Sequence, residues 1–442
     1  MSTPRIPPAD PSAKANAGRV RTALGAASEL EEILAARRPV DVWLSAWYRA
    51  HPECGSRDRR FLSETLFSYL RWRGWIGTVS ERGALALFAA HQLQSSGPSP
   101  LTEALAEAAG VAADRLPPIA PFSLDEKARA LAKLFDQEPL PIDRLVPDWV
   151  PHKLALPPDE DSGSYFSRCV ESFQIRPPLW LSAIGISAME LVHRLSVQSV
   201  PARIDARLAG AVCLEGWPHL PELERAIGPC FEVQDLASQA VVAACAPNPG
   251  ETWWDSCAGS GGKSLGLAER MSRKGHVWAT DIRRSALVEL QRRVRRTGFT
   301  EIRWRQQCGL NPPPGRLDGV LVDAPCSGMG TWSRSPDARW RMEAEEVKAL
   351  AQLQRQLLDS AARAVHPGGR LVYSVCTLTH EETTNTAEEF LNAHPDFLPD
   401  PFQHPLGIRS SAAAQWILPW NGPSGSMFVA RWRRNGVIGT DR

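Results

Sequence analysis

Two cysteines that directly follow strand-like segments are the side chains best suited to covalent chemistry in this chain. Cys326 comes after GVLVDAP (319–325), and Cys376 comes after GRLVYSV (369–375). One cysteine near a strand is usually a packing residue, but two at neighbouring strand ends, the first preceded by Asp323, favour catalysis. Because an activated thiolate is a strong nucleophile, the pattern predicts covalent catalysis by one thiol with help from the other.

Methyl transfer to carbon 5 of cytosine is a reaction that requires this set of groups. Carbon 5 is a poor nucleophile until a thiolate adds to carbon 6 and converts the ring to an enamine. A carboxyl group near ring nitrogen 3 stabilises the adduct, and Asp323 is the candidate. A base then removes the carbon 5 proton and the thiol leaves, a step that a second cysteine can assist.

A glycine-rich loop is the candidate cofactor site. Residues 255–264 (DSCAGSGGKS) follow a strand-like segment and open a helical one. Glycines permit close approach of the backbone, and a helix N-terminus offers free N–H groups. Asp281 ends the next strand, where a carboxylate can accept hydrogen bonds from ribose hydroxyls. The loop and Asp281 together favour a site for a dinucleotide or S-adenosyl-L-methionine over an incidental turn. A P-loop is disfavoured, because Cys257 stands where that motif needs glycine.

The elements around these residues predict a doubly wound, mostly parallel α/β sheet over residues 236–434. Strand-like segments alternate with amphipathic helical ones. The strands are 252–257, 276–281, 319–325 and 369–375, and the helices are 236–244, 263–271, 283–296 and 347–361. Ligands of such sheets bind beyond the carboxyl ends of the strands. We therefore expect the candidate residues to meet at one edge.

Two further domains are predicted ahead of this sheet. Residues 19–145 have apolar residues at helical spacing, and residues 160–235 have the mixed pattern of a small α/β unit. A proline-rich stretch, 139–158, separates them. Residues 1–18 are rich in Pro, Ala and Ser, and we expect a disordered start.

Composition narrows the class of protein. The 442 residues are 43% hydrophobic and 22% charged, as in globular proteins, and the net charge of +1 neither requires nor excludes a nucleic acid. Nine scattered cysteines without a CxxC pair indicate neither a metal site nor a disulfide framework. No apolar run reaches the ~20 residues of a membrane helix, and the start lacks a signal-peptide core. We expect a cytoplasmic protein with no membrane partner.

The motifs around the two cysteines resemble those of one family. DAPCSGMGTWSRSPDARW (323–340) and YSVCTLTHEETTN (373–385) are its most specific segments, and the likeness extends from Arg19 to Arg434. The sequence is identified as a member of the Sun/Fmu (RsmB/Nop2) family of RNA 5-methylcytosine methyltransferases, of the bacterial ribosomal RNA type. The resemblance implies a Rossmann-like methyltransferase domain, preceded by a NusB-like helical RNA-binding domain and a small α/β RNA-binding domain.

The resemblance also implies roles for single residues. Cys376 is the expected nucleophile, Cys326 assists release, and Asp323 contacts the base close to the cofactor. Asp281 is expected to hold the ribose of S-adenosyl-L-methionine. The residues expected to wrap the methionine part are Cys257, Ala258, Gly259, Ser260, Gly261, Gly262 and Lys263. In DNA cytosine methyltransferases the Pro-Cys cysteine is the nucleophile, so Cys326 remains a rival for that role.

Two of the places where the sequence departs from the family pattern lie in the expected cofactor site. Gly259-Ser260 replaces Ala-Pro in the loop, and Gln307 or Cys308 stands where the family has an acidic residue near the adenine. These changes motivate the alternative of a non-catalytic RNA-binding or ribosome-assembly factor. A DNA cytosine methyltransferase is the third reading. The expected partner is RNA, and the resemblance implies ribosomal RNA, either naked or in an assembling particle. The expected oligomeric state is a monomer.

Basic and aromatic residues are the candidate RNA contacts. The stretch 270–316 contains twelve Arg or Lys and three acidic residues, a net charge of +9, which is typical of a phosphate-binding patch or of a solvated helix face. Arg334, Arg339 and Arg341 follow the Pro-Cys motif, and Trp332 and Trp340 are candidates for base stacking. Further candidates in the helical region are Arg57, Arg59, Arg60, Arg71 and Arg73.

Overall fold

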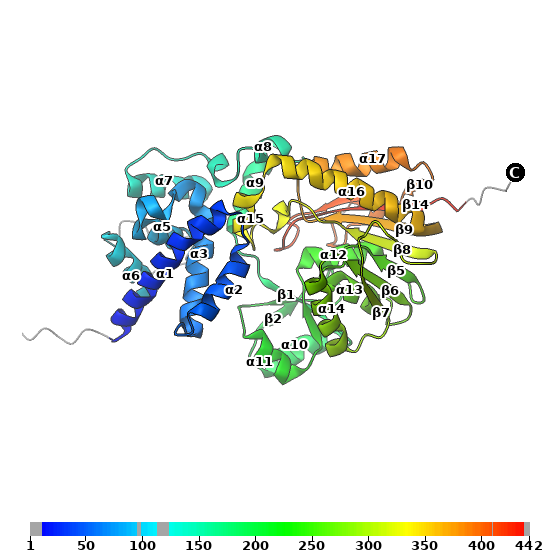
Figure 1. Ribbon diagram of the computed structural model, residues 1–442, viewed down its shortest axis with the longest axis horizontal. Coiled ribbons are helices and arrows are strands. Elements are labelled where there is room, and N and C mark those ends of the chain that lie inside the picture. The colour runs from blue at the N-terminus through cyan, green and yellow to red at the C-terminus, as the bar shows by residue number, and fades with distance from the viewer. Residues whose placement is uncertain (1–10, 95–98, 113–122, 409, 437–442) are drawn as a thin grey trace, which may run out of the picture. The chain divides into compact units, whose positions relative to one another are not determined.

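The chain forms two compact units in a computed structural model that describes residues 11–94, 99–112, 123–408 and 410–436. The helical unit comprises Met1–His152, Glu160–Ile175 and Trp332–Met342, and the sheet unit comprises Lys153–Asp159, Arg176–Thr331 and Glu343–Arg442. Figure 1 shows the elements of both.

The helical unit confirms the predicted helical front region. Its helices are α1 (Pro11–Ala35), α2 (Val40–Ala50), α3 (Ser56–Ile76), α4 (Val79–Arg82), α5 (Ala84–Gln94), α6 (Pro100–Ala109), α7 (Leu124–Phe135), α8 (Val150–Lys153), α9 (Ser162–Gln174) and α15 (Pro336–Arg341). Helix α1 begins eight residues before Arg19, because an alanine-rich segment favours helix. The expected disordered start is therefore wrong for residues 11–18, and residues 1–10 lie outside the described residues.

Two segments belong to the helical unit although the sequence placed them elsewhere. Helix α9 was expected in the small domain, and Trp332–Met342 in the methyltransferase domain. Phe173 of α9 packs edge-to-face on Trp332, with ring centroids 5.3 Å apart. Since both side chains are buried there, tertiary packing rather than sequence order decides which unit contains them.

The sheet unit begins with a small antiparallel sheet of order β2-β3-β1-β4. Its elements are β1 (Leu179–Ala183), α10 (Ala188–Val197), β2 (Ala202–Ile204), β3 (Ala211–Leu214), α11 (Leu220–Ile227) and β4 (Phe231–Val233). Leu181, Val212 and Leu195 form part of its apolar cluster. The expected α/β pattern is therefore present from residue 176 onward.

The large sheet has the strand order β10-β14-β9-β8-β5-β6-β7, with β13 beside β14. The strands are β5 (Thr252–Asp255), β6 (His276–Asp281), β7 (Ile302–Gln306), β8 (Leu317–Asp323), β9 (Val365–Val375), β10 (Phe397–Pro399), β13 (Ala414–Ile417) and β14 (Met427–Arg434). Strands β5 to β9 pair in parallel, whereas β14 runs antiparallel to its neighbours. Outside it, β11 (Phe402–Gln403) pairs with β12 (Ser411–Ala412).

Helices cover both faces of the large sheet, as predicted for a doubly wound fold. Helices α12 (Leu236–Cys245), α13 (Gly262–Arg270) and α14 (Arg284–Thr297) lie on one face, and α16 (Ala344–Ala364) and α17 (Thr386–Ala393) lie on the other (Figure 1). Strand order reverses between β5 and β8, and ligands of such sheets bind beyond the strand ends at that point. Among the described residues, no helix combines the length and apolarity needed to cross a membrane.

Candidate active site

The two candidate catalytic cysteines lie side by side beyond the ends of β8 and β9. These strands pair in parallel with Asp323 opposite Ser374, so their carboxyl ends emerge together. The Sγ atoms of Cys326 and Cys376 are 3.3 Å apart, and both residues are partly exposed. The prediction that tertiary structure brings the two thiols together is confirmed.

The proton affinity of Cys326 is unusually high. Its hydrogen bond with Cys376 raises its pKa well above the usual range, and burial, the charge of Cys376 and the charge of Glu382 act in the same direction. In this environment Cys326 therefore remains a thiol more readily than an ordinary cysteine does.

A close backbone contact holds the Cys326 loop against the two neighbouring segments. The N–H of Gly330 donates to the carbonyl of Cys376 at 2.9 Å, and the N–H of Ser426 donates to the carbonyl of Gly330 at 2.9 Å. A Cβ atom on Gly330 would lie 2.1 Å from the Ser426 carbonyl oxygen. Only glycine fits this position, which explains its place four residues after Cys326.

Asp323 connects the cysteine strands to the glycine loop. One carboxylate oxygen accepts a hydrogen bond from Ser374 at 2.7 Å, and the other accepts one from the Lys263 ammonium at 2.7 Å. Burial acts to lower the pKa of Lys263, but the Asp323 carboxylate, with Cys376 and Asp255, outweighs burial and raises it. Lys263 thus remains a cation next to the candidate nucleophile.

The glycine loop follows β5 and opens α13, as the sequence predicted. The first turn of a helix leaves N–H groups without helical acceptors, and here they belong to the segment from Gly262 onward. Gly261 has φ +86°, and a Cβ there would lie 2.5 Å from the Leu290 side chain. The loop therefore requires glycine for its turn and for its packing on α14.

Asp255 is a buried carboxyl group beneath this loop. It accepts a hydrogen bond from the Ser264 hydroxyl at 2.7 Å, while its other oxygen has no hydrogen-bond partner among the described residues. Burial raises the pKa of Asp255 to about 7, and the Asp323 charge adds to the effect. Burial also raises the pKa of Cys257, so this thiol is a poor candidate for a third nucleophile.

Asp281 ends β6 on the other side of the loop. Its carboxylate accepts hydrogen bonds from the backbone N–H of Gly259 at 2.9 Å and from the backbone and side chain of Arg283. Burial acts to raise the pKa of Asp281, but the Arg283 and Gly259 hydrogen bonds outweigh it and lower the pKa. Asp281 is therefore an ionised acceptor, which fits a ribose diol. Its partner Arg283 is largely exposed and can move away from the carboxylate when a ligand binds.

The segment after β7 contains Gln307 and Cys308, which stand where the family has an acidic residue. The Gln307 side-chain amide donates to the Asn311 carbonyl, and Cys308 is partly exposed. A Cβ atom on the neighbouring Gly309 would lie 2.7 Å from the Leu357 side chain and 2.8 Å from the Ser256 carbonyl oxygen. Within the described ranges, no group of three or more His, Cys, Asp or Glu side chains is arranged to hold a metal ion.

Two of the predicted RNA contacts are wrong, because both side chains are fully buried in the helical unit. Trp332 and Arg339 have 0% exposure. The Arg339 guanidinium donates to the carbonyls of Leu145 and Phe173, and burial lowers its pKa to about 9. A group that is enclosed by its own unit cannot contact a nucleic acid in this conformation.

Three other candidates near them are also committed to internal contacts. Arg71, 4% exposed, donates to the Ser333 carbonyl at 2.8 Å. The Trp340 indole N–H donates to the Leu70 carbonyl. Arg341 pairs with Asp337. The prediction of an RNA contact is therefore wrong for buried Arg71.

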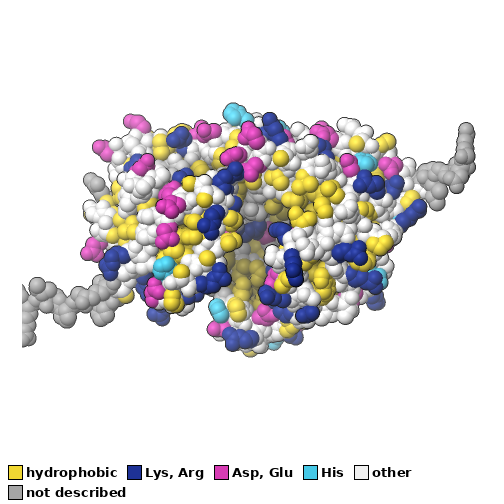
Figure 2. Space-filling model, in the orientation of Figure 1, with side chains coloured by type: hydrophobic (Ala, Val, Ile, Leu, Met, Phe, Trp, Pro, Cys, Tyr) yellow, Lys and Arg dark blue, Asp and Glu magenta, His cyan; other side chains and the backbone are white. Residues whose placement is uncertain are grey.

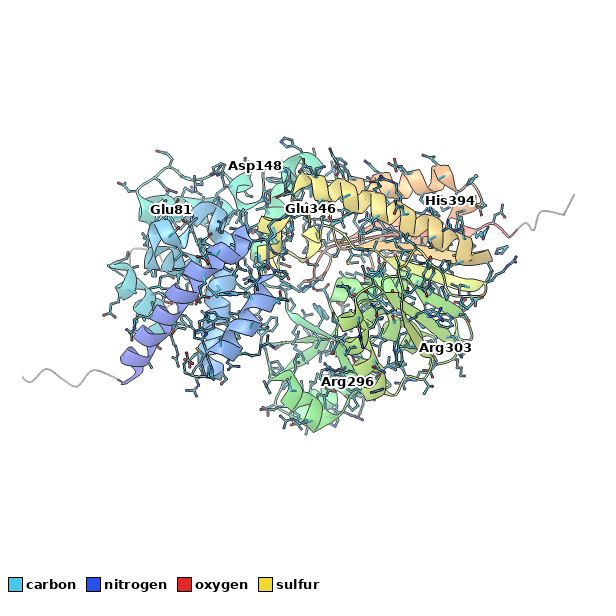
Figure 3. The ribbon with its side chains drawn as sticks, in the orientation of Figure 1. Glu81, Asp148, Arg296, Arg303, Glu346 and His394 are labelled. Carbon is cyan, nitrogen blue, oxygen red and sulfur yellow. The ribbon has the colours of Figure 1, made fainter. Side chains whose placement is uncertain are left out.

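The basic stretch 270–316 is partly neutralised within the sheet unit. Arg296 pairs with Glu224 and Glu232, and Arg293 pairs with Glu232 at 3.7 Å. Figure 2 shows Lys and Arg side chains gathered over α14, and Figure 3 shows Arg296 beside α11 and Arg303 at the sheet edge. The arginines of α14 and β7 that are exposed are Arg284, Arg292, Arg295, Arg296, Arg303 and Arg305.

Sequence reasoning missed Glu382. This residue is fully buried beside the cysteine loops and accepts a hydrogen bond from the backbone N–H of Ser327 at 2.9 Å. A helix-like segment with two adjacent acids, Glu381 and Glu382, looks solvent-exposed in the sequence. The one available signal is that the acids follow Cys376 within six residues.

Comparison with known proteins supports the same reading of the sheet unit. Residues 242–433 match the family model described as 16S rRNA methyltransferase RsmB/F. The probable ribosomal RNA small subunit methyltransferase B of Synechocystis sp. is 38% identical over 212 residues, which cover 46% of this chain and 48% of that protein. The ribosomal RNA small subunit methyltransferase B of Thermus thermophilus is 37% identical over 204 residues, which cover 46% and 50%.

The likeness therefore spans about half the length of these curated relatives. Over the whole chain, a crystal structure described as that of PH0851 has a TM-score of 0.73 at 23% identity, and covers 98% of this chain and 100% of that one, which shows a shared fold. Together with the motifs around Cys326 and Cys376, the family match confirms the predicted resemblance. Over residues 242–433, this chain is thus similar to the family described as 16S rRNA methyltransferase RsmB/F.

Proposed function

We propose that the protein transfers a methyl group from S-adenosyl-L-methionine to carbon 5 of a cytosine in RNA, and that this RNA is ribosomal. The observation that carries the proposal is the 3.3 Å contact between the Cys326 and Cys376 sulfurs beside Asp323. Carbon 5 chemistry requires a thiol nucleophile, whereas methylation of an already nucleophilic oxygen or nitrogen does not. The family description and the relatives' names support the ribosomal substrate.

The glycine loop and Asp281 fit the methyl donor. When bound, S-adenosyl-L-methionine supplies an activated methyl group. The residues from Cys257 to Lys263, together with the free N–H groups at the start of α13, would hold its methionine part. The ionised Asp281 would hold its ribose, and the unpartnered oxygen of Asp255 lies beneath the same loop.

Cys376 is the proposed nucleophile. Its sulfur forms a bond to carbon 6 of the cytosine, and the ring electrons move so that carbon 5 becomes nucleophilic. The Lys263 cation interacts electrostatically with Cys376, and a nearby positive charge favours the thiolate form. Asp323, held by Lys263 and Ser374, would contact the base near ring nitrogen 3.

Cys326 is proposed to assist product release. After methyl transfer, a base removes the carbon 5 proton, the double bond between carbons 5 and 6 forms again, and the bond to Cys376 breaks. The Cys326 thiol is within hydrogen-bonding contact of the departing sulfur. Because its pKa is raised, Cys326 is still protonated when the Cys376 thiolate leaves, and its S–H can donate a hydrogen bond to that thiolate.

The two cysteine roles are tested with the wild-type protein, Cys376→Ala and Cys326→Ala. Each is incubated with unmodified ribosomal RNA and labelled methyl donor, and both transferred label and denaturant-stable protein–RNA adducts are measured. We expect Cys376→Ala to be inert and Cys326→Ala to accumulate adduct. Loss of adduct in Cys326→Ala instead would reverse the roles and favour a DNA-type mechanism.

The alternative of a non-catalytic RNA-binding factor is tested by the wild-type protein alone. No transfer to RNA or to ribosomal particles, together with no binding of the methyl donor in a titration, would support that alternative.

We further propose that the protein acts as a cytoplasmic monomer, and that the NusB-like helical unit and the small sheet bind RNA. The proposed phosphate contacts are four exposed arginines of α14 and β7, namely Arg292, Arg295, Arg303 and Arg305.

A further inference from the structure

Glu382 is a buried carboxylate that four neutral donors surround. It lies in the π-helical turn Glu381–Asn385 and is 0% exposed. One oxygen accepts from the backbone N–H of Ser327 at 2.9 Å and from the Gln354 amide at 3.0 Å. The other accepts from the hydroxyls of Ser327 and of Thr379, the latter at 2.8 Å. Because a buried polar group is costly unless it is hydrogen-bonded, these four contacts satisfy both oxygens of the buried side chain.

The donors come from both cysteine loops. Ser327 directly follows Cys326, and its hydroxyl also meets the Thr377 hydroxyl at 2.7 Å. Thr377 directly follows Cys376, so the residues after the two cysteines are joined to each other. Glu382 bonds to Ser327 and Thr379, and therefore to both loops.

Helix α16 and strand β9 complete the network. Gln354 donates to Glu382 and also to the Pro325 carbonyl at 2.9 Å, on the other side of Cys326. The Tyr373 hydroxyl donates to the Glu382 carbonyl and contacts the Gln354 amide oxygen. The backbone is thus held on both sides of Cys326, at Pro325 and at Ser327.

The charges around the two thiols are unequal. Glu382 acts on Cys326 and raises its pKa, after the larger effects of the Cys376 hydrogen bond and burial. Cys376 interacts with the Lys263 cation, whose own partner is Asp323. Tyr373 also faces Cys326, and burial raises the pKa of this phenol, so it stays neutral. A negative group on one side and a positive group on the other favour the proton on Cys326.

We propose that Glu382 is a positioning residue, which holds the two cysteine loops so that the sulfurs stay in contact and keeps the shared proton on Cys326, leaving Cys376 as the thiolate. The inference rests on the proposed cytosine chemistry, in which either cysteine is a candidate nucleophile. It identifies Glu382 as the buried charge that makes the two cysteines different.

A thiol titration tests the electrostatic part without any methyl transfer. In a Cys376→Ala background, alkylation of the Cys326 peptide is followed by mass spectrometry from about pH 6 to 11. We expect Glu382→Gln to lower the midpoint for Cys326 by about one pH unit. The matched control Glu388→Gln, on the exposed face of α17, is expected to leave the midpoint unchanged. An unchanged midpoint in Glu382→Gln would overturn the electrostatic role.

A kinetic comparison tests the positioning part. With both cysteines present, we expect Glu382→Gln to lower kcat about 100-fold, because small misplacements of reacting groups are costly, with KM for RNA unchanged. Wild-type kcat in this variant would overturn the positioning role. A wild-type protein that methylates no RNA would refute the proposed function, while the titration would still decide whether Glu382 controls Cys326.

A milder variant covers the case in which Glu382→Gln does not fold. Ser327→Ala removes the hydroxyl contacts to Glu382 and Thr377 but keeps the buried charge. We expect a kcat about 10-fold below wild type and an unchanged Cys326 midpoint. Loss of methyl-donor binding in Ser327→Ala, with no separate loss in kcat, would indicate a purely structural network and overturn the proposal.

Discussion

The two halves of the candidate active site are built by different physical means. The half at the ends of β5 and β6 consists of loop backbone and strand-end carboxylates, such as Asp281. The half at the ends of β8 and β9 consists of side chains that a buried network places, with Glu382 at its centre. The first half therefore accepts Gly259-Ser260 in place of another loop sequence, because backbone N–H groups remain. The second depends on the identity of each side chain.

The largest expected effect is a loss of methyl transfer that leaves the cofactor half of the site intact. Cys376→Ala should abolish methyl transfer, because no other side chain can replace the attacking sulfur. Affinity for S-adenosyl-L-methionine should stay within about 2-fold of wild type, measured by calorimetric titration. A large loss of affinity in this variant would mean that the halves are coupled.

Lys263 lies in the first half but acts on residues of the second, so its substitution should change the chemistry of the cysteines. It extends from the glycine loop to Asp323 and acts on Cys376. We expect Lys263→Met to lower kcat about 100-fold and to slow alkylation of Cys376. Lys274→Met removes an exposed lysine from the same region and should match wild type. Equal behaviour of the two variants would show that the Lys263 charge is not used.

Asp281 should affect the cofactor half alone. Asp281→Asn keeps the shape of the side chain but removes the charge that strengthens its hydrogen bonds. We expect affinity for S-adenosyl-L-methionine to fall about 10-fold, measured by calorimetric titration. The alkylation midpoints of Cys326 and Cys376 should be unchanged, and a shift in either would contradict the separation.

Asp255 should produce the smallest effect, visible in stability rather than in rate. Its pKa is raised from 3.8 to about 7 in the folded state. Between these values the unfolded chain releases a proton that the folded chain keeps, so the free energy of unfolding falls as pH rises. The slope is at most about 1.4 kcal/mol per pH unit.

Urea denaturation between about pH 4 and 7, the interval set by the two pKa values, measures this slope. Asp255→Asn has no proton to release there, so its stability should decline less steeply than that of the wild type. Parallel curves for the two proteins would show that Asp255 ionises normally in the folded state.

Arginine and tryptophan near the Pro-Cys motif show where sequence reasoning fails. Arg339 and Trp332 have the residue types of RNA contacts and stand in the right stretch of sequence. Both are buried in the helical unit, where Arg339 bonds to two backbone carbonyls. Whether a charged side chain faces solvent depends on segments far away in the chain, so composition cannot decide it.

The sequence by itself determined the elements that have local causes. The alternation of apolar strands with amphipathic helices predicts the doubly wound sheet, and the position of Cys326, Cys376, Asp281 and Asp323 at strand ends predicts one site. These features follow from periodicity and from parallel pairing, which brings carboxyl ends to one edge.

Only the tertiary structure decided which groups control the two thiols. Glu382 follows an acidic neighbour in a segment that looks solvent-exposed. Apart from the nearby Thr379, its donors come from two other segments, around Ser327 and Gln354. Burial and hydrogen bonding turn this carboxylate into the charge beside Cys326. Proton affinities depend on what surrounds a group in space, and no local pattern in the chain contains that information.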